Sequence, residues 1–180
     1  MILKVDDYEL RVIPDTDATM LYTIMQENAE YLSEYLDFIK DITLEAEKMA
    51  IKTWQNMFLN GLGYEAGIYI NDKLIGMCGI RINKTDDRGE IGYWLAKEYT
   101  GKGIMTRIVL EVINSGFKAY GLNKITIKCV DTNYKSQAIP KRLGFKFDGI
   151  QRQHQKLRGE YRDLYVFSML RSEWNVFFNN

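Results

Sequence analysis

Apolar residues recur along this chain with two different periods, and the order in which the periods alternate predicts the fold. Alternation at every second residue predicts strands over residues 8–13, 64–70, 74–82, 90–95, 124–130, 145–152 and 161–170. Spacing of three and four predicts helices over residues 17–36, 43–60, 104–120 and 136–143. The element order is therefore β-α-α-β-β-β-α-β-α-β-β, which indicates a mixed α/β (α+β) sheet protein.

Local signals refine these elements. Asp17 is the expected N-cap of the first helix, and the polar segments 71–73 and 85–87 predict hairpin turns that join three strands into an antiparallel meander. Pro140 lacks an N–H group, so the helix that contains it is expected to begin late or to bend. His154 lies in a polar run and is expected in a loop.

Composition indicates one domain over residues 1–180, because 46% of the residues are hydrophobic and no low-complexity stretch or linker interrupts them. Lys plus Arg equals Asp plus Glu at 24 each, so no excess charge favours a nucleic acid or an anionic membrane as partner. The sequence shows neither a signal peptide nor a run of the ~20 apolar residues that span a bilayer. We therefore expect a soluble, cytoplasmic protein.

Cysteine and histidine content argues against metal and thiol chemistry. Cys78 and Cys129 both fall inside strand patterns, where a free cysteine is usually a small buried hydrophobe, so no disulfide is expected. His154 is the only histidine. We expect no metal site and no nucleophile paired with histidine.

The segment Gly101-Lys102-Gly103-Ile104-Met105-Thr106 lies where the 90–95 strand ends and the 104–120 helix begins. Glycines at such a turn let backbone N–H groups approach a phosphate at the positive end of the helix. A tight loop without a ligand is the alternative. Thr106 stands where a dinucleotide fingerprint has a third small residue, no Walker A sequence is present, and the turn follows the fourth strand rather than the first. A Rossmann domain and a P-loop are therefore disfavoured.

A second segment, from Asn133 through Ser136 to Gly144-Phe145, follows the next strand. Together with the glycine turn and the element order, it resembles the GNAT superfamily of acetyl-CoA-dependent N-acetyltransferases over nearly the whole chain. The stretches 28–38, 91–95, 101–105 and 159–163 are most similar to its RimL/RimJ-like branch, which acetylates N-termini of ribosomal proteins. Thr100 and Met105 depart from the family pattern, which has Gln or Arg and Gly or Ala at these positions.

The resemblance implies the fold of that superfamily, acetyl-CoA as co-substrate, and a set of residues that contact it. The 101–106 loop would hold the pyrophosphate, and Asn133 and Ser136 would contact the pantetheine arm. The pantetheine would lie where two strands splay apart, beside the end of the 90–95 strand. The implied cofactor-binding residues are Trp94, Leu95, Ala96, Gly101, Lys102, Gly103, Ile104, Met105, Thr106, Asn133 and Ser136.

Amide formation needs an oxyanion donor, a proton for the leaving thiolate, and an acceptor for the amine proton. We expect the backbone N–H near Leu95 as oxyanion donor and the hydroxyl of Ser136 as thiolate donor, with helix capping as the alternative role of Ser136. Glu90 and Glu65 are the candidate bases, and either is otherwise a solvated carboxylate at a strand.

The predicted function is transfer of an acetyl group from acetyl-CoA to a primary amine, with a protein N-terminal α-amine favoured. The alternatives are a small amine, such as a polyamine, an aminoglycoside or another antibiotic, and a module that binds CoA without turnover. Near the C-terminus, Trp174, Phe177 and Phe178 are expected to pack back on the sheet or to meet a second subunit in a homodimer.

Overall fold

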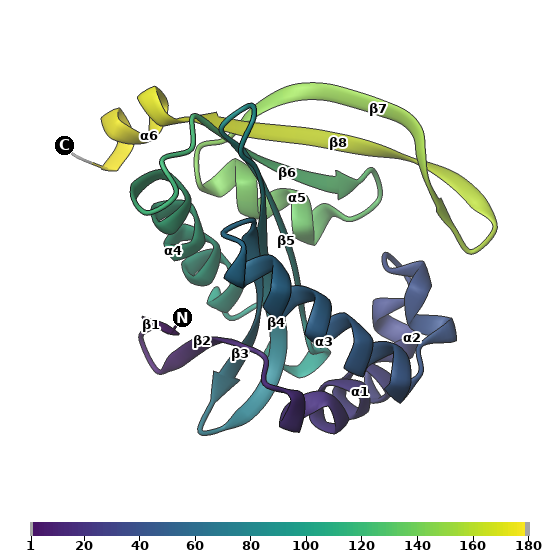
Figure 1. The fold of residues 1–180 in the computed structure, drawn as a ribbon. Coiled ribbons are helices and arrows are strands. Elements are labelled where there is room, and N and C mark those ends of the chain that lie inside the picture. The colour runs from purple at the N-terminus through teal and green to yellow at the C-terminus, as the bar shows by residue number, and fades with distance from the viewer. Residues whose placement is uncertain (1, 179–180) are drawn as a thin grey trace.

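Eight strands form one sheet in the computed structural model, which describes residues 2–178 (Figure 1). Their spatial order is β1-β2-β3-β4-β5-β6-β8-β7, and β5–β6 is the one parallel pair among them. The strands are β1 (Ile2–Val5), β2 (Tyr8–Val12), β3 (Gly63–Ile70), β4 (Lys73–Asn83), β5 (Arg88–Leu95), β6 (Lys124–Val130), β7 (Lys146–Leu157) and β8 (Glu160–Leu170). The mixed sheet expected from the sequence is thus confirmed.

Helices cover both faces of this sheet. The α-helices are α1 (Ala18–Glu27), α2 (Ala29–Leu32), α3 (Leu44–Leu59), α4 (Ile104–Lys118), α5 (Tyr134–Arg142) and α6 (Arg171–Phe178). Short 3₁₀ helices are η1 (Asp15–Asp17), η2 (Asp37–Asp41) and η3 (Lys97–Tyr99). Apolar residues of α1 and α3 pack against one face, and those of α4 and α5 pack against the other.

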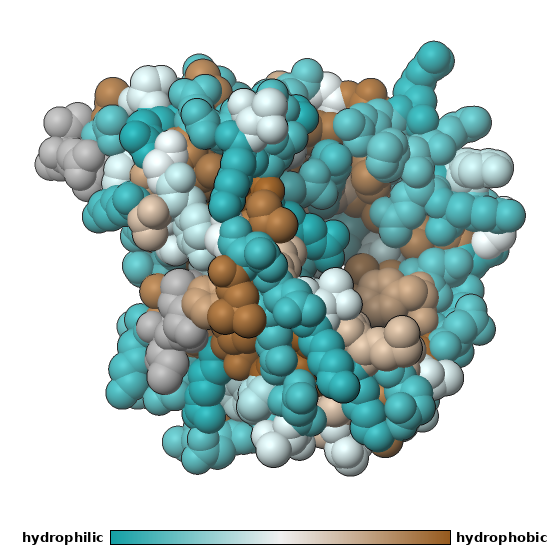
Figure 2. Space-filling view, viewed as in Figure 1, coloured by the Kyte–Doolittle hydropathy of each residue, from teal (hydrophilic) through white to brown (hydrophobic). Residues whose placement is uncertain are grey.

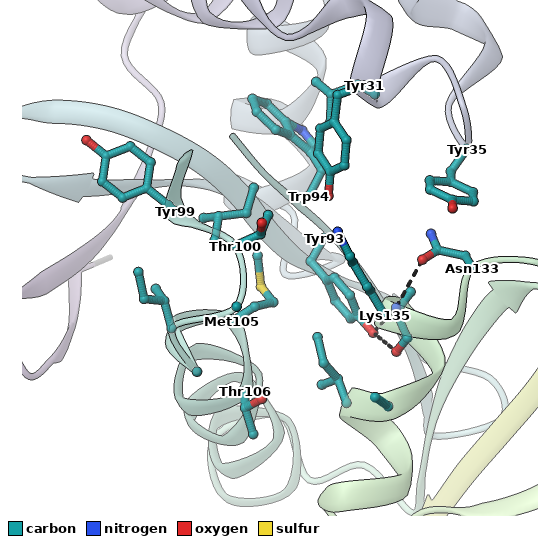
Figure 3. A pocket seen from close by; sticks show the side chains of 18 of the residues that line it. Tyr31, Tyr35, Tyr93, Trp94, Tyr99, Thr100, Met105, Thr106, Asn133 and Lys135 are labelled. Carbon is teal, nitrogen blue, oxygen red and sulfur yellow. Dashed lines mark hydrogen bonds between the residues drawn. The ribbon is translucent and has the colours of Figure 1, made fainter. Parts of the chain in front are cut away.

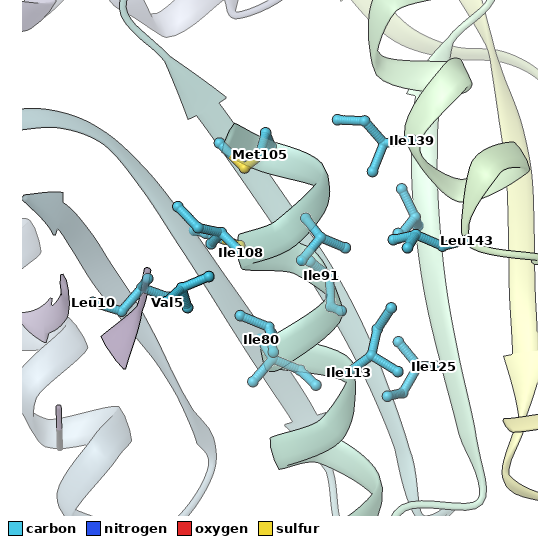
Figure 4. Close-up of a cluster of buried hydrophobic side chains, with 14 of the residues drawn as sticks. Val5, Leu10, Ile80, Ile91, Met105, Ile108, Ile113, Ile125, Ile139 and Leu143 are labelled. Carbon is cyan, nitrogen blue, oxygen red and sulfur yellow. The ribbon is translucent and has the colours of Figure 1, made fainter. Parts of the chain in front are cut away.

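The larger core lies between α4 and the sheet (Figure 4). Ile108 and Ile113 of α4 are fully buried against Ile80 of β4 and Ile125 of β6. Their spacing is the apolar stripe that predicted this helix. Each fully buried aliphatic side chain contributes about 1.5–3 kcal/mol relative to exposure, so this stripe fixes α4, and the loop before it, on the sheet.

The parallel pair separates partway along its length. β5 and β6 pair from Arg88 with Lys124 to Ile91 with Ile127 and no further, although both strands continue. The splayed strands implied by the family resemblance are therefore present. Between them the backbone edge of β5 beyond Ile91 is open.

Several elements differ from the sequence expectations. β1 and α6 were not predicted, and the predicted 17–36 helix is broken at Asn28, whose φ and ψ are −108° and 11°. The amide of Asn28 donates to the Ile24 carbonyl at 2.9 Å and accepts from the Lys97 N–H at 2.9 Å. The side chain of Asn28 therefore joins the last turn of α1 to the backbone at Lys97, where α1 ends.

Three further expectations are corrected. Asp17 precedes α1 but makes no capping bond, because its Oδ2 accepts from the Tyr69 hydroxyl at 2.7 Å. The helix with Pro140 begins early, at Tyr134, and includes the proline. His154 lies within β7, where the register with β8 shifts, and not in a loop.

The C-terminal helix packs back on the core. Trp174 is 5% exposed, and its ring centroid lies 5.4 Å from that of Phe117 in α4. The predicted packing of Trp174 is therefore confirmed, whereas the side chains of Phe177 and Phe178 lie outside the described part of the structure. None of the helices in residues 2–178 has the length and apolar character needed to cross a bilayer.

Candidate active site

A groove of about 660 Å³ opens where β5 and β6 part, between α4 and α5 and below α2 (Figure 3). It contains most of the residues that the sequence assigned to the cofactor: Trp94, Leu95, Gly101, Gly103, Ile104, Met105, Thr106, Asn133 and Ser136. Two assigned residues lie outside its lining. Lys102 is exposed with its amine 5.4 Å from the Tyr99 ring centroid, and Ala96 is 1% exposed in the core beside α1.

The glycine loop leads directly into the first turn of α4. Gly101 and Gly103 have φ of +77° and +74°, which L side chains rarely adopt, and Gly103 is the N-cap residue. No side chain caps α4 and its first turn holds no acidic residue. The N–H groups at its N-terminus are therefore available to an anion.

Cationic side chains also line the groove. Arg107, Lys135 and Arg142 all contribute to the lining, and Arg107 is ion-paired with Asp6 at 2.8 Å. Arg142 donates to the Thr106 hydroxyl at 2.8 Å, which holds the guanidinium across the gap between α5 and α4. Because the chain has no net charge, this cluster is a local concentration of positive charge rather than a general property of the surface.

The open edge of β5 presents backbone donors to the groove. Ala96 donates its N–H to the Ile75 carbonyl of β4 at 2.9 Å. N–H groups alternate sides along a strand, so those of Tyr93 and Leu95 point away from β4 and into the groove. This orientation agrees with the predicted use of the Leu95 N–H, and its role as oxyanion donor stays a prediction.

Asn133, rather than Ser136, caps α5. The Oδ1 of Asn133 accepts from the Ser136 N–H at 3.0 Å, as an N-cap side chain does with the third residue of a helix. The capping role weighed for Ser136 is therefore wrong. The Ser136 hydroxyl instead contacts other side chains beside the groove.

The Ser136 carbonyl has an unusual partner that Pro140 explains. In an α-helix this carbonyl would accept from the N–H four residues later, but that residue is Pro140, which has none. The Tyr93 hydroxyl donates to the Ser136 carbonyl at 3.1 Å instead. Figure 3 shows Tyr93 reaching from β5 toward α5. Pro140 thus creates the acceptor that ties α5 to β5.

The hydroxyls of Tyr93 and Ser136 form a small cluster with the thiol of Cys129. Ser136 Oγ donates to the Tyr93 hydroxyl at 3.2 Å and lies 3.2 Å from Cys129 Sγ. Burial raises the pKa of Cys129 and raises that of Tyr93 well above its usual value, so both keep their protons. With Ser136 donating to Tyr93, the thiol donates to Ser136.

A second cavity of about 190 Å³ lies on the side of β5 that faces α1 and α3, and it shares Leu36, Tyr93 and Trp94 with the groove. We call it the acidic cavity, because its lining contains the carboxylates of Glu47, Glu65 and Glu90 among mostly apolar side chains. In the view of Figure 2 the surface is hollowed between the β7–β8 hairpin and the helices α2 and α3.

The two carboxylates predicted from the sequence both hold ion pairs. Glu65 Oε1 lies 2.8 Å from Arg81 Nε, and Glu90 Oε2 lies 2.8 Å from Lys128 Nζ. Burial raises the pKa of Glu65, and Arg81 opposes the shift. The Glu65 side chain can lie here because residue 79 is glycine. A Cβ at position 79 would come within 2.3 Å of Glu65 Oε2.

Glu47 is the carboxylate that the sequence reasoning missed. It is 5% exposed, and its Oε2 has no hydrogen-bond partner among the described residues. Burial raises the pKa of this carboxyl as well. A signal was present in the sequence, since Glu47 interrupts the apolar stripe of α3 formed by Leu44, Ile51 and Trp54.

Residues 2–178 contain no group of three or more His, Cys, Asp or Glu side chains placed to hold a metal ion. The groups that the site does offer are backbone donors, hydroxyls and carboxylates. All three kinds of group converge on Tyr93 and Trp94, where the groove and the acidic cavity meet.

Comparison with known proteins agrees with this geometry. A model of the acetyltransferase (GNAT) domain matches residues 8–146. YdaF of Bacillus subtilis (strain 168), provisionally named a ribosomal N-acetyltransferase, is 31% identical over a 175-residue alignment that covers 95% of this chain and 96% of that protein. The ribosomal-protein-serine acetyltransferase of Escherichia coli (strain K12) is 27% identical over 169 residues, 92% of this chain and 93% of that one.

A solved structure with a similar fold is that of RimL, a ribosomal α-N-protein acetyltransferase, in complex with coenzyme A. It has a TM-score of 0.90 at 22% identity and covers 94% of this chain and 98% of its own.

Proposed function

The chain belongs to the GNAT acetyltransferase family, and on that premise we propose that it acetylates the α-amine at the N-terminus of a protein. Its activity as an acetyl-CoA-dependent N-acetyltransferase follows from the family. Similarity over more than nine-tenths of the chain to relatives named for ribosomal proteins supports a protein N-terminus as acceptor. An acceptor on a ribosomal protein would put the reaction in the cytoplasm.

The groove suits the co-substrate at both of its ends. The N-terminus of α4, with Gly101 and Gly103 leaving its backbone unobstructed, would bind the pyrophosphate, and Arg142 adds a cation beside it. The open edge of β5 would hydrogen-bond the pantetheine amides. The thioester would then lie near the N–H of Leu95 and the hydroxyl of Ser136.

The observation that carries the proposal is that the acidic cavity meets the groove at Tyr93 and Trp94. The lining holds three carboxylates and one arginine, so its net charge is negative and favours a cation, and an amine is a cation at neutral pH. The volume of about 190 Å³ suits an amine and one residue-sized group better than a whole aminoglycoside. The apolar remainder of the lining would contact the first side chain of a peptide.

A thiol-release assay with acetyl-CoA tests the acceptor. The panel contains peptides with a free α-amine, the same peptides with that amine blocked, spermidine and kanamycin. We expect thiol release with the free peptides and none with the blocked ones. Release with spermidine or kanamycin alone would show a small-amine acetyltransferase. Binding of CoA without release above hydrolysis for any amine would show a binding module.

Ser136→Ala tests the proton donor in the same assay. We expect kcat to fall by about 100-fold, within the range for loss of a general acid, while the CoA dissociation constant stays within about twofold. An unchanged kcat would remove Ser136 from the mechanism.

A further inference from the structure

The charges around the acidic cavity do not balance among the described residues. Glu65 is neutralised by Arg81 and Glu90 by Lys128, each at 2.8 Å, whereas Glu47 has no cation within ion-pair distance in residues 2–178. Glu47 is also the least exposed of the three, at 5%. The unpaired negative charge of the cavity is therefore concentrated on a buried carboxylate.

The fold supports this carboxylate without satisfying it. Glu47 lies in the first turn of α3, after the N-cap Thr43, whose hydroxyl accepts from Ala46 rather than approaching Glu47. A helix N-terminus supplies only partial positive charge. A buried carboxylate oxygen without a donor is costly, and such a group in a cavity indicates a ligand that donates hydrogen bonds.

We propose that Glu47 is the catalytic residue that receives the acceptor amine, binding its ammonium group and taking one proton from it. This rests on the N-acetyltransferase function proposed above. The ammonium group has the two properties that the cavity lacks, positive charge and N–H donors. Glu47 lines the cavity together with Tyr93 and Trp94, which also line the groove, so an amine bound to it would face the thioester.

The proton balance of the step is simple. An N–H bond of the ammonium breaks and an O–H bond forms on Glu47, which leaves a lone pair on nitrogen. That pair forms the C–N bond with the acetyl carbon, and the C–S bond breaks. The nitrogen then loses a second proton. This proton passes to the leaving thiolate, either directly or by way of the Ser136 hydroxyl. The proton on Glu47 returns to water when the amide leaves.

Burial favours this transfer. It raises the pKa of the Glu47 carboxyl toward that of an amine, which lessens the cost of moving the proton. The neighbouring ionisable groups, Glu65, Glu90 and Arg81, are already in ion pairs, so the unpaired negative charge of the cavity is that of Glu47. An amine proton therefore has one unpaired carboxylate to go to.

Glu47→Gln keeps the shape of the side chain and removes its charge. Glu45→Gln is the matched control, because Glu45 lies in the same turn of α3 with its side chain 78% exposed. With acetyl-CoA and a seven-residue peptide bearing a free N-terminal serine, we expect Glu47→Gln to lower kcat/KM by at least about 100-fold. Glu45→Gln should stay within about twofold. A Glu47→Gln value within about threefold of the unmodified protein would overturn the proposal.

A binding measurement separates this inference from the choice of acceptor. Trp54 and Trp94 line the acidic cavity, so n-butylammonium added to the CoA-bound protein should change the tryptophan fluorescence, and n-butanol should not. Glu47→Gln should weaken n-butylammonium binding about tenfold or more, and Glu45→Gln should not. Equal binding by both variants would overturn the amine site, even if peptides are acetylated. Weakened binding with an unchanged kcat would overturn the proton transfer. If no peptide is acetylated but binding depends on Glu47, the N-terminal acceptor fails and the amine site stands.

Discussion

Breaking the hydrogen bonds between Tyr93 and α5 should destabilise the protein by an amount that depends on Pro140. Tyr93→Phe removes the donor to the Ser136 carbonyl and the acceptor for the Ser136 hydroxyl, at 3.1 and 3.2 Å. A half-buried carbonyl left unpaired costs about 1–3 kcal/mol. We expect a loss of about 2 kcal/mol, which for a chain of this length lowers Tm by about 4–8 °C.

Pro140→Ala supplies the comparison. Alanine at position 140 has an N–H that can donate to the Ser136 carbonyl within the helix, so that carbonyl no longer depends on Tyr93. In this background Tyr93→Phe should cost about 1 kcal/mol less, because the Ser136 carbonyl stays paired when the tyrosine hydroxyl is lost. The double-mutant cycle measures this coupling directly.

Urea and thermal unfolding of the four proteins of the cycle give the required free energies. Tyr134→Phe is the control for removing a hydroxyl, because Tyr134 is on the same helix and 74% exposed, and it should change stability by less than about 0.5 kcal/mol. If Tyr93→Phe costs the same with proline and with alanine at position 140, the missing N–H does not explain the contact between β5 and α5.

Three further predictions concern the two cavities. Burial raises the pKa of Glu47 in the folded protein, so the ionised carboxylate destabilises the fold as pH rises above the ordinary carboxyl range. Glu47→Gln should therefore increase the free energy of unfolding, measured with urea, by about 1–3 kcal/mol near pH 8 and by less near pH 5. A gain that is the same at both pH values would contradict this. Gly103→Ala, at φ +74°, should cost about 1–2 kcal/mol in backbone strain and weaken CoA binding about tenfold by calorimetry, and unaltered affinity would argue against a backbone phosphate site. Arg142→Ala should weaken CoA binding about three- to tenfold at low salt and less in about 1 M salt, whereas a loss independent of salt would indicate a structural role through Thr106.

The sequence was sufficient for elements with a clear period. The apolar stripe of α4 and the alternation of β3 to β5 gave bounds within about two residues, since burial on one face is what creates these patterns. The glycine loop was recognisable because positive φ at Gly101 and Gly103 requires a particular residue type.

Features that depend on contacts between distant segments could not be read from the sequence. The break at Asn28 rests on a bond to Lys97, 69 residues later, and the carbonyl freed by Pro140 has meaning only because Tyr93 lies beside it. Glu47 was overlooked for the same reason. Its helix pattern shows that it is buried, but only the packing of α3 on the sheet shows that it faces an acidic cavity next to the groove.

Asn28 has a mechanical consequence for the order of substrate binding. Its side chain fastens the end of α1, which borders the acidic cavity through Met25, to Lys97 in the turn that leads to Gly101. Any outward movement of α1 that admits an acceptor must either stretch this bond or carry the Lys97 turn with it. The proposed amine site and the glycine loop are thus linked through one asparagine side chain, so CoA bound to that loop would restrain α1 where it borders the cavity.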